Sequence, residues 1–290
     1  MTQMTATGRV VARGADRFRR PSALERIADW VARVPIAPSV RRVLKKLYWL
    51  ALTWQTRGRG LVRMLPGGET IRVLPQYSYL SWNPDEYRAF RDVVRPGMVA
   101  LDIGANVGAY STLLGRWVGS SGIVFAFEPA PTAFEGLTRH VELNHLSGIV
   151  KPIRAALSDR AATARFLLAD SAGESRLAGD TEDGHRRAIP VTSLTIDEVC
   201  RREGVAPDFI KIDVEGSELA VLRGARETIR ARRGRLAVFV ELHPTIWPRL
   251  GVSRDDVLGE LRALSLAPEI LKPVADLWAI DGMCVRLREI

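Results

Sequence analysis

Short apolar runs alternate with amphipathic stretches along the chain from Val99 onward. The runs span residues 99–103, 123–128, 150–157, 209–214 and 236–241. Each has the length of a buried strand, and the helical periodicity of stretches such as 131–144 and 217–231 predicts helices between them. This alternation favours right-handed crossovers and a mostly parallel sheet that is covered by helices on both faces.

Two segments depart from the alternation. Residues 164–196 predict an inserted antiparallel pair of strands around a polar, Gly-rich loop, and residues 269–290 predict a final hairpin that closes one sheet edge. Ahead of Val99, the pattern predicts helices over 22–34 and 38–54, a hairpin over 64–75 with a Pro-Gly-Gly turn, and a helix that starts near Asn83.

These elements suggest three parts. We expect a flexible basic tail over residues 1–22, a helical and hairpin extension over 23–82 that serves as a lid or acceptor-binding region, and a main α/β domain over 83–290. The net charge of +9 is unevenly spread, because residues 1–65 hold 14 Lys and Arg against three Asp and Glu. Residues 66–290 hold 28 Lys and Arg against 30 Asp and Glu. The charge of the main domain therefore gives no indication of a cleft for nucleic acid.

Targeting signals are not evident. No apolar segment approaches the roughly 20 residues that span a bilayer, and arginines occupy the N-terminal region where a signal peptide has its apolar core. The two cysteines, Cys200 and Cys284, offer no disulfide framework. We expect a cytoplasmic protein.

The segment ALDIGANVGAYS, residues 100–111, places a glycine-rich turn directly after a buried strand. Gly104 and Gly108 bracket this turn, where ligands collect in open parallel sheets. Glu128 ends the next strand, at the spacing of an acid that accepts hydrogen bonds from ribose hydroxyls. A tight turn without a ligand is the competing interpretation of the glycines alone.

The kind of cofactor follows from what the turn lacks. Asn106 and Ala109 occupy positions where the dinucleotide fingerprint has glycines, and there is no P-loop lysine. Asp102 would repel a pyrophosphate but can pair with an ammonium group. A nucleoside that carries an amino acid satisfies both ends, and S-adenosylmethionine is the common one.

Four blocks together resemble the FkbM-type family of S-adenosylmethionine-dependent methyltransferases: DIGANVGAYS, FEPAPTAFEGLTRHVELN, DFIKIDVEGSELAVLRGA and VFVELHP, within residues 95–245. The resemblance implies a class I methyltransferase (Rossmann-like) fold with a seven-stranded sheet, and methylation of a hydroxyl on a sugar, glycolipid, polyketide or related natural product. It also implies cofactor contacts from Asp102, Gly104, Ala105, Asn106 and Gly108 near the methionine portion, from Glu128 at the ribose, and from Asn144, Ala156 and Ser158 near the adenine.

Hydroxyl methylation needs a group that removes the proton and holds the oxygen opposite the sulfur. The ends of the fourth and fifth strands supply the candidates, which are Lys211, Asp213, Glu215, Glu241 and His243. We expect Asp213 to bind or deprotonate the acceptor, and Lys211 to orient Asp213 or stabilise the alkoxide. His243 is a natural general base near neutral pH, although it could equally cap the loop before Pro244. A structural ion pair is the alternative for Lys211 and Asp213.

Several alternatives stay open at this point. Asp213, Glu241 and His243 could ligate a divalent metal, although the spacing does not require it. The chain could instead methylate RNA ribose, or be an inactive methyltransferase fold that binds a partner. The basic helix over 38–54 could be a lid or a peripheral membrane contact. A homodimer is compatible with the sequence.

Overall fold

The structure, a computed structural model, describes residues 38–169, 175–178 and 187–290. The chain forms two compact units, Met1–Tyr79 and Leu80–Ile290. The division falls close to the end of the extension predicted over 23–82. The predicted tail over 1–22 and the predicted helix over 22–34 lie outside the described residues.

The first unit contains a helix and a hairpin. Helix α2 (Pro38–Gln55) is followed by β1 (Leu61–Met64) and β2 (Thr70–Val73), which pair antiparallel, and by the short helix η1 (Pro75–Tyr77). The predicted turn closes the hairpin, since Gly68 adopts a φ of 81° and its N–H donates to the Leu65 carbonyl. The predicted helix over 38–54 and the hairpin are confirmed.

The second unit is built on a mostly parallel sheet. Among its described residues, seven strands lie in the order β12-β13-β11-β10-β3-β4-β5, and only β13 runs antiparallel to its neighbours. Their bounds are β3 (Val99–Ile103), β4 (Ile123–Phe127), β5 (Val150–Ile153), β10 (Phe209–Ile212), β11 (Ala237–Leu242), β12 (Leu266–Ile270) and β13 (Met283–Glu289). The C-terminal hairpin closes one edge of the sheet, as predicted. The order reverses between β3 and β10, where ligands bind in open α/β sheets.

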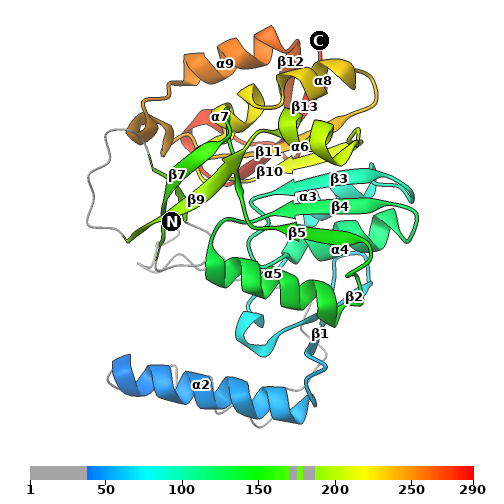
Figure 1. The fold of residues 1–290 in the computed structure, drawn as a ribbon, viewed down its shortest axis with the longest axis vertical. Coiled ribbons are helices and arrows are strands. Elements are labelled where there is room, and N and C mark those ends of the chain that lie inside the picture. Colours follow the sequence, from blue (N-terminus) through cyan, green and yellow to red (C-terminus); the bar gives the residue numbers. More distant parts are fainter. Residues whose placement is uncertain (1–37, 170–174, 179–186) are drawn as a thin grey trace. The chain divides into compact units, whose positions relative to one another are not determined.

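Helices cover both faces of this sheet (Figure 1). Helices α4 (Ala109–Val118) and α5 (Pro131–Leu143) pack together on one face, where α3 (Pro84–Arg91) also places Phe90. The other face carries α6 (Ile196–Glu203), α7 (Glu218–Arg223), α8 (Arg226–Ala231) and α9 (Arg254–Ala263). Short helices η2 (Trp247–Leu250) and η3 (Leu277–Ala279) complete the unit.

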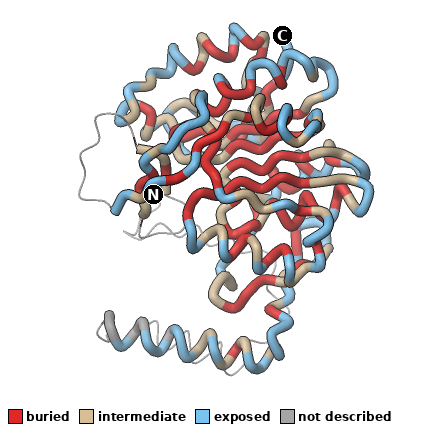
Figure 2. Tube along the Cα trace, viewed as in Figure 1, coloured by how far each residue is buried: buried red, intermediate tan, exposed pale blue. Residues whose placement is uncertain are grey.

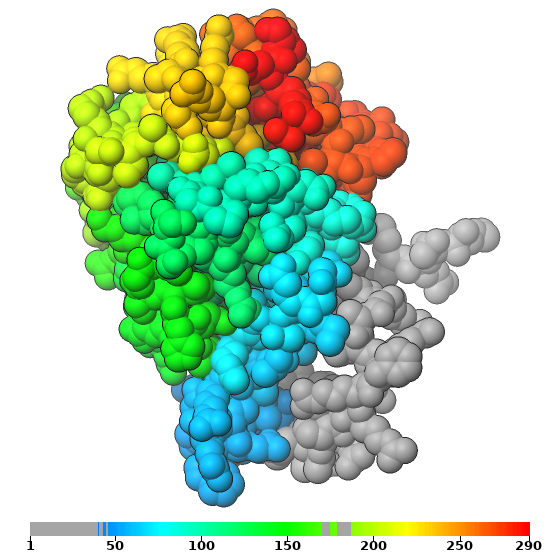
Figure 3. Space-filling model, turned by 90° about the vertical axis from the view of Figure 1, so that its right-hand side faces the viewer, coloured from blue at the N-terminus to red at the C-terminus, as the bar shows by residue number. Residues whose placement is uncertain are grey.

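A second, smaller sheet holds the insertion. Its order is β6 (Ala156–Leu157), β9 (Ala188–Leu194), β7 (Ala162–Leu167) and β8 (Arg176–Leu177). Strands β7 and β9 pair antiparallel over their length, which confirms the pair predicted within 164–196. Figure 3 shows the C-terminal segments, coloured yellow to red, gathered at one end of the unit.

Strand alternation divides the sheet residues between two cores. Leu101, Ile103, Ile210 and Ile212 join one buried cluster with apolar residues of α6 to α9. Figure 2 shows the strands as the main buried part of the unit. The alternate residues point to the face covered by α3 and α4, and these include polar groups that the site uses.

Two predicted elements are each divided in the structure. The helix predicted over 217–231 breaks into α7 and α8, because a Cβ on Gly224 would lie 2.0 Å from the Ser158 carbonyl oxygen and the Gly224 carbonyl accepts from Asp197 N–H. The strand predicted over 150–157 ends at Ile153, and its remainder becomes β6 of the smaller sheet. Both breaks arise from contacts with segments distant in sequence.

Candidate active site

The glycine-rich turn after β3 is held by the backbone of β4. The N–H groups of Gly104 and Ala105 both donate to the Phe127 carbonyl, at 3.1 and 2.9 Å. Asn106 has a φ of 48°, a left-handed conformation that asparagine tolerates better than most residues. Its N–H donates to a carboxylate oxygen of Glu128 at 2.8 Å.

The two glycines of the turn are required by packing. Gly104 has a φ of 79°, and a Cβ there would lie 1.6 Å from the Asp213 carbonyl oxygen at the end of β10. Gly108 has a φ of 85°, and its Cβ would lie 2.7 Å from Leu137 of α5. Packing alone therefore explains both glycines, and a role of the turn in binding a ligand is compatible with it.

Glu128 braces this turn and the start of α5. One oxygen accepts from Asn106 N–H, and the other accepts from Ala130 N–H at 2.8 Å. Burial raises the pKa of Glu128 to about 7, against the effect of these two hydrogen bonds. The remaining lone pairs of this buried carboxylate are available to hydroxyl groups of a ligand.

His140 is a further support that the sequence did not single out. It is buried on α5, and its Nδ1 lies 2.6 Å from the Val107 carbonyl oxygen of the turn. Burial lowers the pKa of His140, which favours the neutral ring with the proton on Nδ1. Its position in the α5 pattern looked like an ordinary helix face, so only the fold reveals the contact.

Asp102 lies inside β3 with one oxygen satisfied. Ser111 of α4 donates to Oδ2 at 2.5 Å. Oδ1 is buried and has no hydrogen-bond partner among the residues that the structure describes. Burial raises the pKa of Asp102, while Lys211 and Ser111 oppose that effect. A buried acceptor without a partner fits a cationic group of a ligand.

Register brings four charged side chains to one face. Lys211 of β10 lies beside Asp102 of β3 on one side and beside Phe239 of β11 on the other. Asp213 and Glu241 each follow by two residues, so they share that face. Lys211 is buried, and its Nζ lies 3.0 Å from an Asp213 oxygen. Burial would lower the pKa of Lys211, but Asp213, Asp102 and Glu241 raise it above its usual value.

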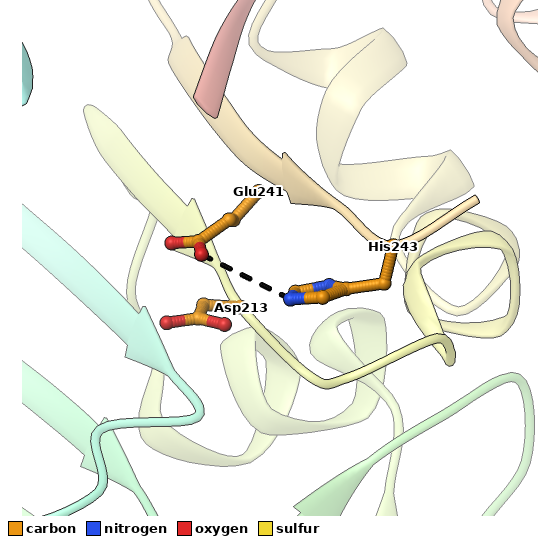
Figure 4. Close-up of side chains that lie close together, drawn as sticks. All are labelled: Asp213, Glu241 and His243. Carbon is orange, nitrogen blue, oxygen red and sulfur yellow. Dashed lines mark ion pairs between the residues drawn. The ribbon is translucent and has the colours of Figure 1, made fainter. Parts of the chain in front are cut away.

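Asp213, Glu241 and His243 converge at the ends of β10 and β11 (Figure 4). One ligand atom from each lies within 4.8 Å of the others. The Asp213 side chain is 26 % exposed whereas that of Lys211 is 3 % exposed, so solvent reaches the carboxylate and not the ammonium. Burial and Asp213 raise the pKa of Glu241 to about 8.

His243 is oriented by Glu218, which was not among the site residues predicted from the sequence. Glu218 is fully buried and accepts from His243 Nδ1 at 2.8 Å, from Trp247 Nε1 at 2.7 Å and from Gly216 N–H at 2.8 Å. Burial would lower the pKa of His243, but Glu218, Glu215 and Asp213 raise it to about 9. His243 Nε2 faces Glu215 at 3.5 Å and Glu241 at 3.9 Å.

Helices α3 and α4 supply a wall that sequence reasoning missed. Glu86 is buried, and Tyr110 donates its hydroxyl hydrogen to it at 2.5 Å. The Lys211 Nζ lies 5.2 Å from the centre of the Tyr110 ring. Burial raises the pKa of Glu86. A glutamate in an amphipathic helix before β3 carries no local signal of such a role.

The three residues predicted near the adenine, Asn144, Ala156 and Ser158, do not join the cluster of charged side chains around Lys211 and Asp213. Asn144 lies at the C-terminal end of α5, where its amide donates to the His140 carbonyl. The 13 residues of α5 place it about 20 Å from the end near Glu128. Ala156 lies in β6, and Ser158 follows that strand and donates its N–H to Leu194.

Comparison with known proteins identifies a family. Residues 102–265 match the methyltransferase FkbM domain. The hexuronic acid methyltransferase AglP of Haloferax volcanii is 28 % identical over 242 residues, which cover 80 % of this chain and 92 % of that protein. The 31-O-demethyl-FK506 methyltransferase FkbM of Streptomyces tacrolimicus is 28 % identical over 235 residues, or 69 % of this chain and 85 % of that one.

A solved structure shows a more distant likeness. The methyltransferase FkbM from Methylobacillus flagellatus aligns with a TM-score of 0.44 and 18 % identity over 70 % of this chain. The alignment spans half of that longer chain. The fold assignment here rests on the strand order of this chain itself.

Proposed function

Because this chain belongs to the FkbM family of S-adenosylmethionine-dependent methyltransferases, we propose that it methylates a hydroxyl of a sugar, glycolipid, polyketide or related natural product. The names of two relatives, a hexuronic acid methyltransferase and a demethyl-FK506 methyltransferase, support these acceptor classes. The observation that carries the proposal is that the carboxylates of Asp213 and Glu241 lie together beside the turn at Gly104.

The residues of the turn fit the cofactor. Asp102 Oδ1 offers a buried acceptor to the ammonium of the methionine portion, and Glu128 offers its free lone pairs to the ribose hydroxyls. The rigid backbone of residues 104–108 would hold the methionine portion between them. S-adenosylmethionine supplies the electrophilic methyl group when bound.

Asp213 is our candidate for contact with the acceptor hydroxyl. Its carboxylate is partly exposed at the strand end and forms an ion pair with the buried Lys211 ammonium. Asp213 accepts the hydroxyl proton as the oxygen attacks. The positive charge of Lys211 stabilises the ionised Asp213 carboxylate before that transfer. Glu241 and Glu215 then line the same space.

The role we propose for His243 differs from the general base expected from the sequence. With a pKa near 9 the imidazole carries its proton at neutral pH, so His243 donates a hydrogen bond from Nε2 to the acceptor. Proton removal therefore belongs to a carboxylate in this proposal.

A divalent metal is the second candidate for this cluster. Two carboxylates and an imidazole are a suitable donor set, and the buried Glu218 holds the histidine as outer partners of metal ligands do. Against this, the Lys211 ammonium already neutralises Asp213. Methyl transfer has no inherent need for a metal. Full turnover after exhaustive EDTA treatment would remove this candidate.

Calorimetry with S-adenosylhomocysteine tests the cofactor assignment. We expect Glu128→Ala to weaken binding by about tenfold or more, since two hydroxyl hydrogen bonds to a charged group are lost. Glu135→Ala is the control, because that glutamate lies exposed on the same helix that Glu128 precedes. No binding by folded wild-type protein would contradict the proposal and favour an inactive fold.

Acceptor screening tests the reaction. Hexuronic acids, other sugars and polyketide alcohols should be compared with RNA in assays of methyl transfer. Asp213→Asn is expected to retain S-adenosylhomocysteine binding and to lose about 100-fold or more in turnover. Methylation of RNA ribose without transfer to small acceptors would replace this proposal with its rival.

A further inference from the structure

Helix α2 carries an apolar stripe that is exposed. A stripe of this kind on an amphipathic helix normally faces a core. The spacing of three or four residues places its members on one side of the helix. They are Val40 (49 % exposed), Val43 (57 %), Leu44 (37 %), Leu47 (56 %), Leu50 (66 %) and Trp54 (85 %).

The packing of α2 within its own unit uses another side of the helix. Leu52 is 4 % exposed, and it lies two residues from both Leu50 and Trp54. At about 100° per residue, two residues separate side chains by about 200° around the helix. The helix lies against η1 of the same unit. Among the described residues of this unit, the packing of α2 therefore leaves the stripe uncovered.

The charge around the stripe has one sign. Residues 38–65 contain seven Lys and Arg and no Asp or Glu. Among them Lys46 is exposed within α2, next to Leu47. The β1 strand of the same unit adds exposed apolar side chains at Val62 and Met64. A protein partner has no general reason to be anionic and apolar together, whereas a bilayer of acidic lipids presents both properties over a flat surface.

We infer that α2 lies in the interface of a bilayer that contains anionic lipids, with its apolar stripe at the headgroup–acyl boundary. The exposed Lys46 meets the lipid headgroups. None of the helices in the described part of the chain is long and apolar enough to cross a membrane, so α2 would lie along the surface. If the proposed function holds, this contact brings the enzyme to an acceptor carried by the membrane.

Vesicle flotation of the full chain tests the inference. We expect the protein to float with vesicles of phosphatidylcholine mixed with phosphatidylglycerol, and to float much less with phosphatidylcholine alone or in high salt. Leu47→Asp should reduce the bound fraction about tenfold. The matched control is Ile270→Asp, which alters another exposed apolar residue, on β12 of the other unit, and should float like wild type.

Lys46→Glu guards against a trivial loss of helix structure, because it leaves every apolar residue of the stripe in place. It should weaken binding to anionic vesicles and leave the small binding to neutral vesicles unchanged. S-adenosylhomocysteine binding by each variant shows that the second unit is intact. A failure of methyl transfer with normal flotation would reject the proposed function and leave this inference standing.

Three results would overturn the inference. One is the absence of flotation by wild type with anionic vesicles. A second is equal flotation by wild type and Leu47→Asp. The third is self-association in solution that Leu47→Asp abolishes without any effect of lipid, which would assign the stripe to a second copy of the chain.

Discussion

Glu128 joins two tasks in one side chain. It holds the backbone of the glycine turn, and in our proposal it also binds the ribose hydroxyls. Only the ionised carboxylate can accept from all of these donors at once. With a pKa near 7, the protonation state of this residue changes close to neutral pH.

Cofactor affinity should therefore depend on pH. The acid form prevails below pH 7, so the dissociation constant for S-adenosylhomocysteine should rise by up to about tenfold for each pH unit below 7 and level off above it. Calorimetry between pH 5.5 and 8.5, chosen to bracket about 7, measures this. Glu128→Gln should bind weakly with no such slope; an unchanged slope would assign the titration to another group.

Gly104 is expected to tolerate no side chain. Gly104→Ala should lower the free energy of unfolding by more than about 3 kcal/mol, since a left-handed backbone and a clash with the Asp213 carbonyl act together. Gly97→Ala separates the two causes. Gly97 has a φ of 86° but an open surrounding, with the nearest atom, Ser121 Oγ, at 3.6 Å.

Chemical denaturation gives the comparison. The control should lose only about 1–2 kcal/mol, the cost of a left-handed conformation for a residue with a Cβ. Equal losses in both variants would show that the approach of β10 to the turn is looser than the structure indicates.

At the level of elements, Glu218 ties three segments together. Its carboxylate on α7 binds the loop before that helix, the end of β11 through His243, and η2 through Trp247. Glu218→Ala leaves several buried donors without an acceptor, so the free energy of unfolding should fall by about 3–5 kcal/mol. Glu218→Gln should be less damaging but should still lower turnover, because a neutral amide no longer stabilises the protonated His243 ring.

Thermal and chemical unfolding check the stability effect. Turnover is measured at temperatures where each variant is folded. Glu135→Ala, on the exposed side of α5, should stay within about 0.5 kcal/mol of wild type. Normal turnover by Glu218→Gln would show that the negative charge of Glu218 is not needed for the reaction.

The elements also show how far sequence reasoning reaches. The strand predicted over 99–103 has the bounds of β3, because a run of buried residues ended by glycine is a local signal. The break at Gly224 was missed, since it depends on the Ser158 carbonyl on a segment distant in sequence. The sequence predicted that Lys211 and Asp213 interact, whereas the pairing of Lys211 with Asp102 needed the register of the sheet. Glu86 and Tyr110 could not be found, because their meeting depends on how α3 packs.

At the scale of the whole molecule, charge and chemistry are divided between the two units. The first 65 residues carry the excess of basic side chains, and every candidate site residue lies in the second unit. A chain that starts at Leu80 should fold and bind S-adenosylhomocysteine with the affinity of the full protein. Full-length protein should bind a heparin column more tightly than this shorter chain.

The same two proteins, full-length and shortened, also test whether the basic region binds the acceptor, as the RNA alternative expects. If the short chain still methylates small hydroxyl acceptors, the basic region is dispensable for the chemistry. If transfer to every acceptor is lost while cofactor binding persists, residues before Leu80 take part in acceptor binding, as expected for a lid.

The position of β13 has a consequence for synthesis. This strand lies between β11 and β12, so β12 has no partner in the sheet until β13 is in place. It also sets Cys284 opposite Glu241, at the wall of the cluster that holds Asp213 and His243. Domains emerge from the ribosome with their N-terminal segments first. The parallel strands can thus assemble early during translation, but the wall of this cluster is completed only when the last strand inserts, and we expect a chain that ends before β13 to lack activity.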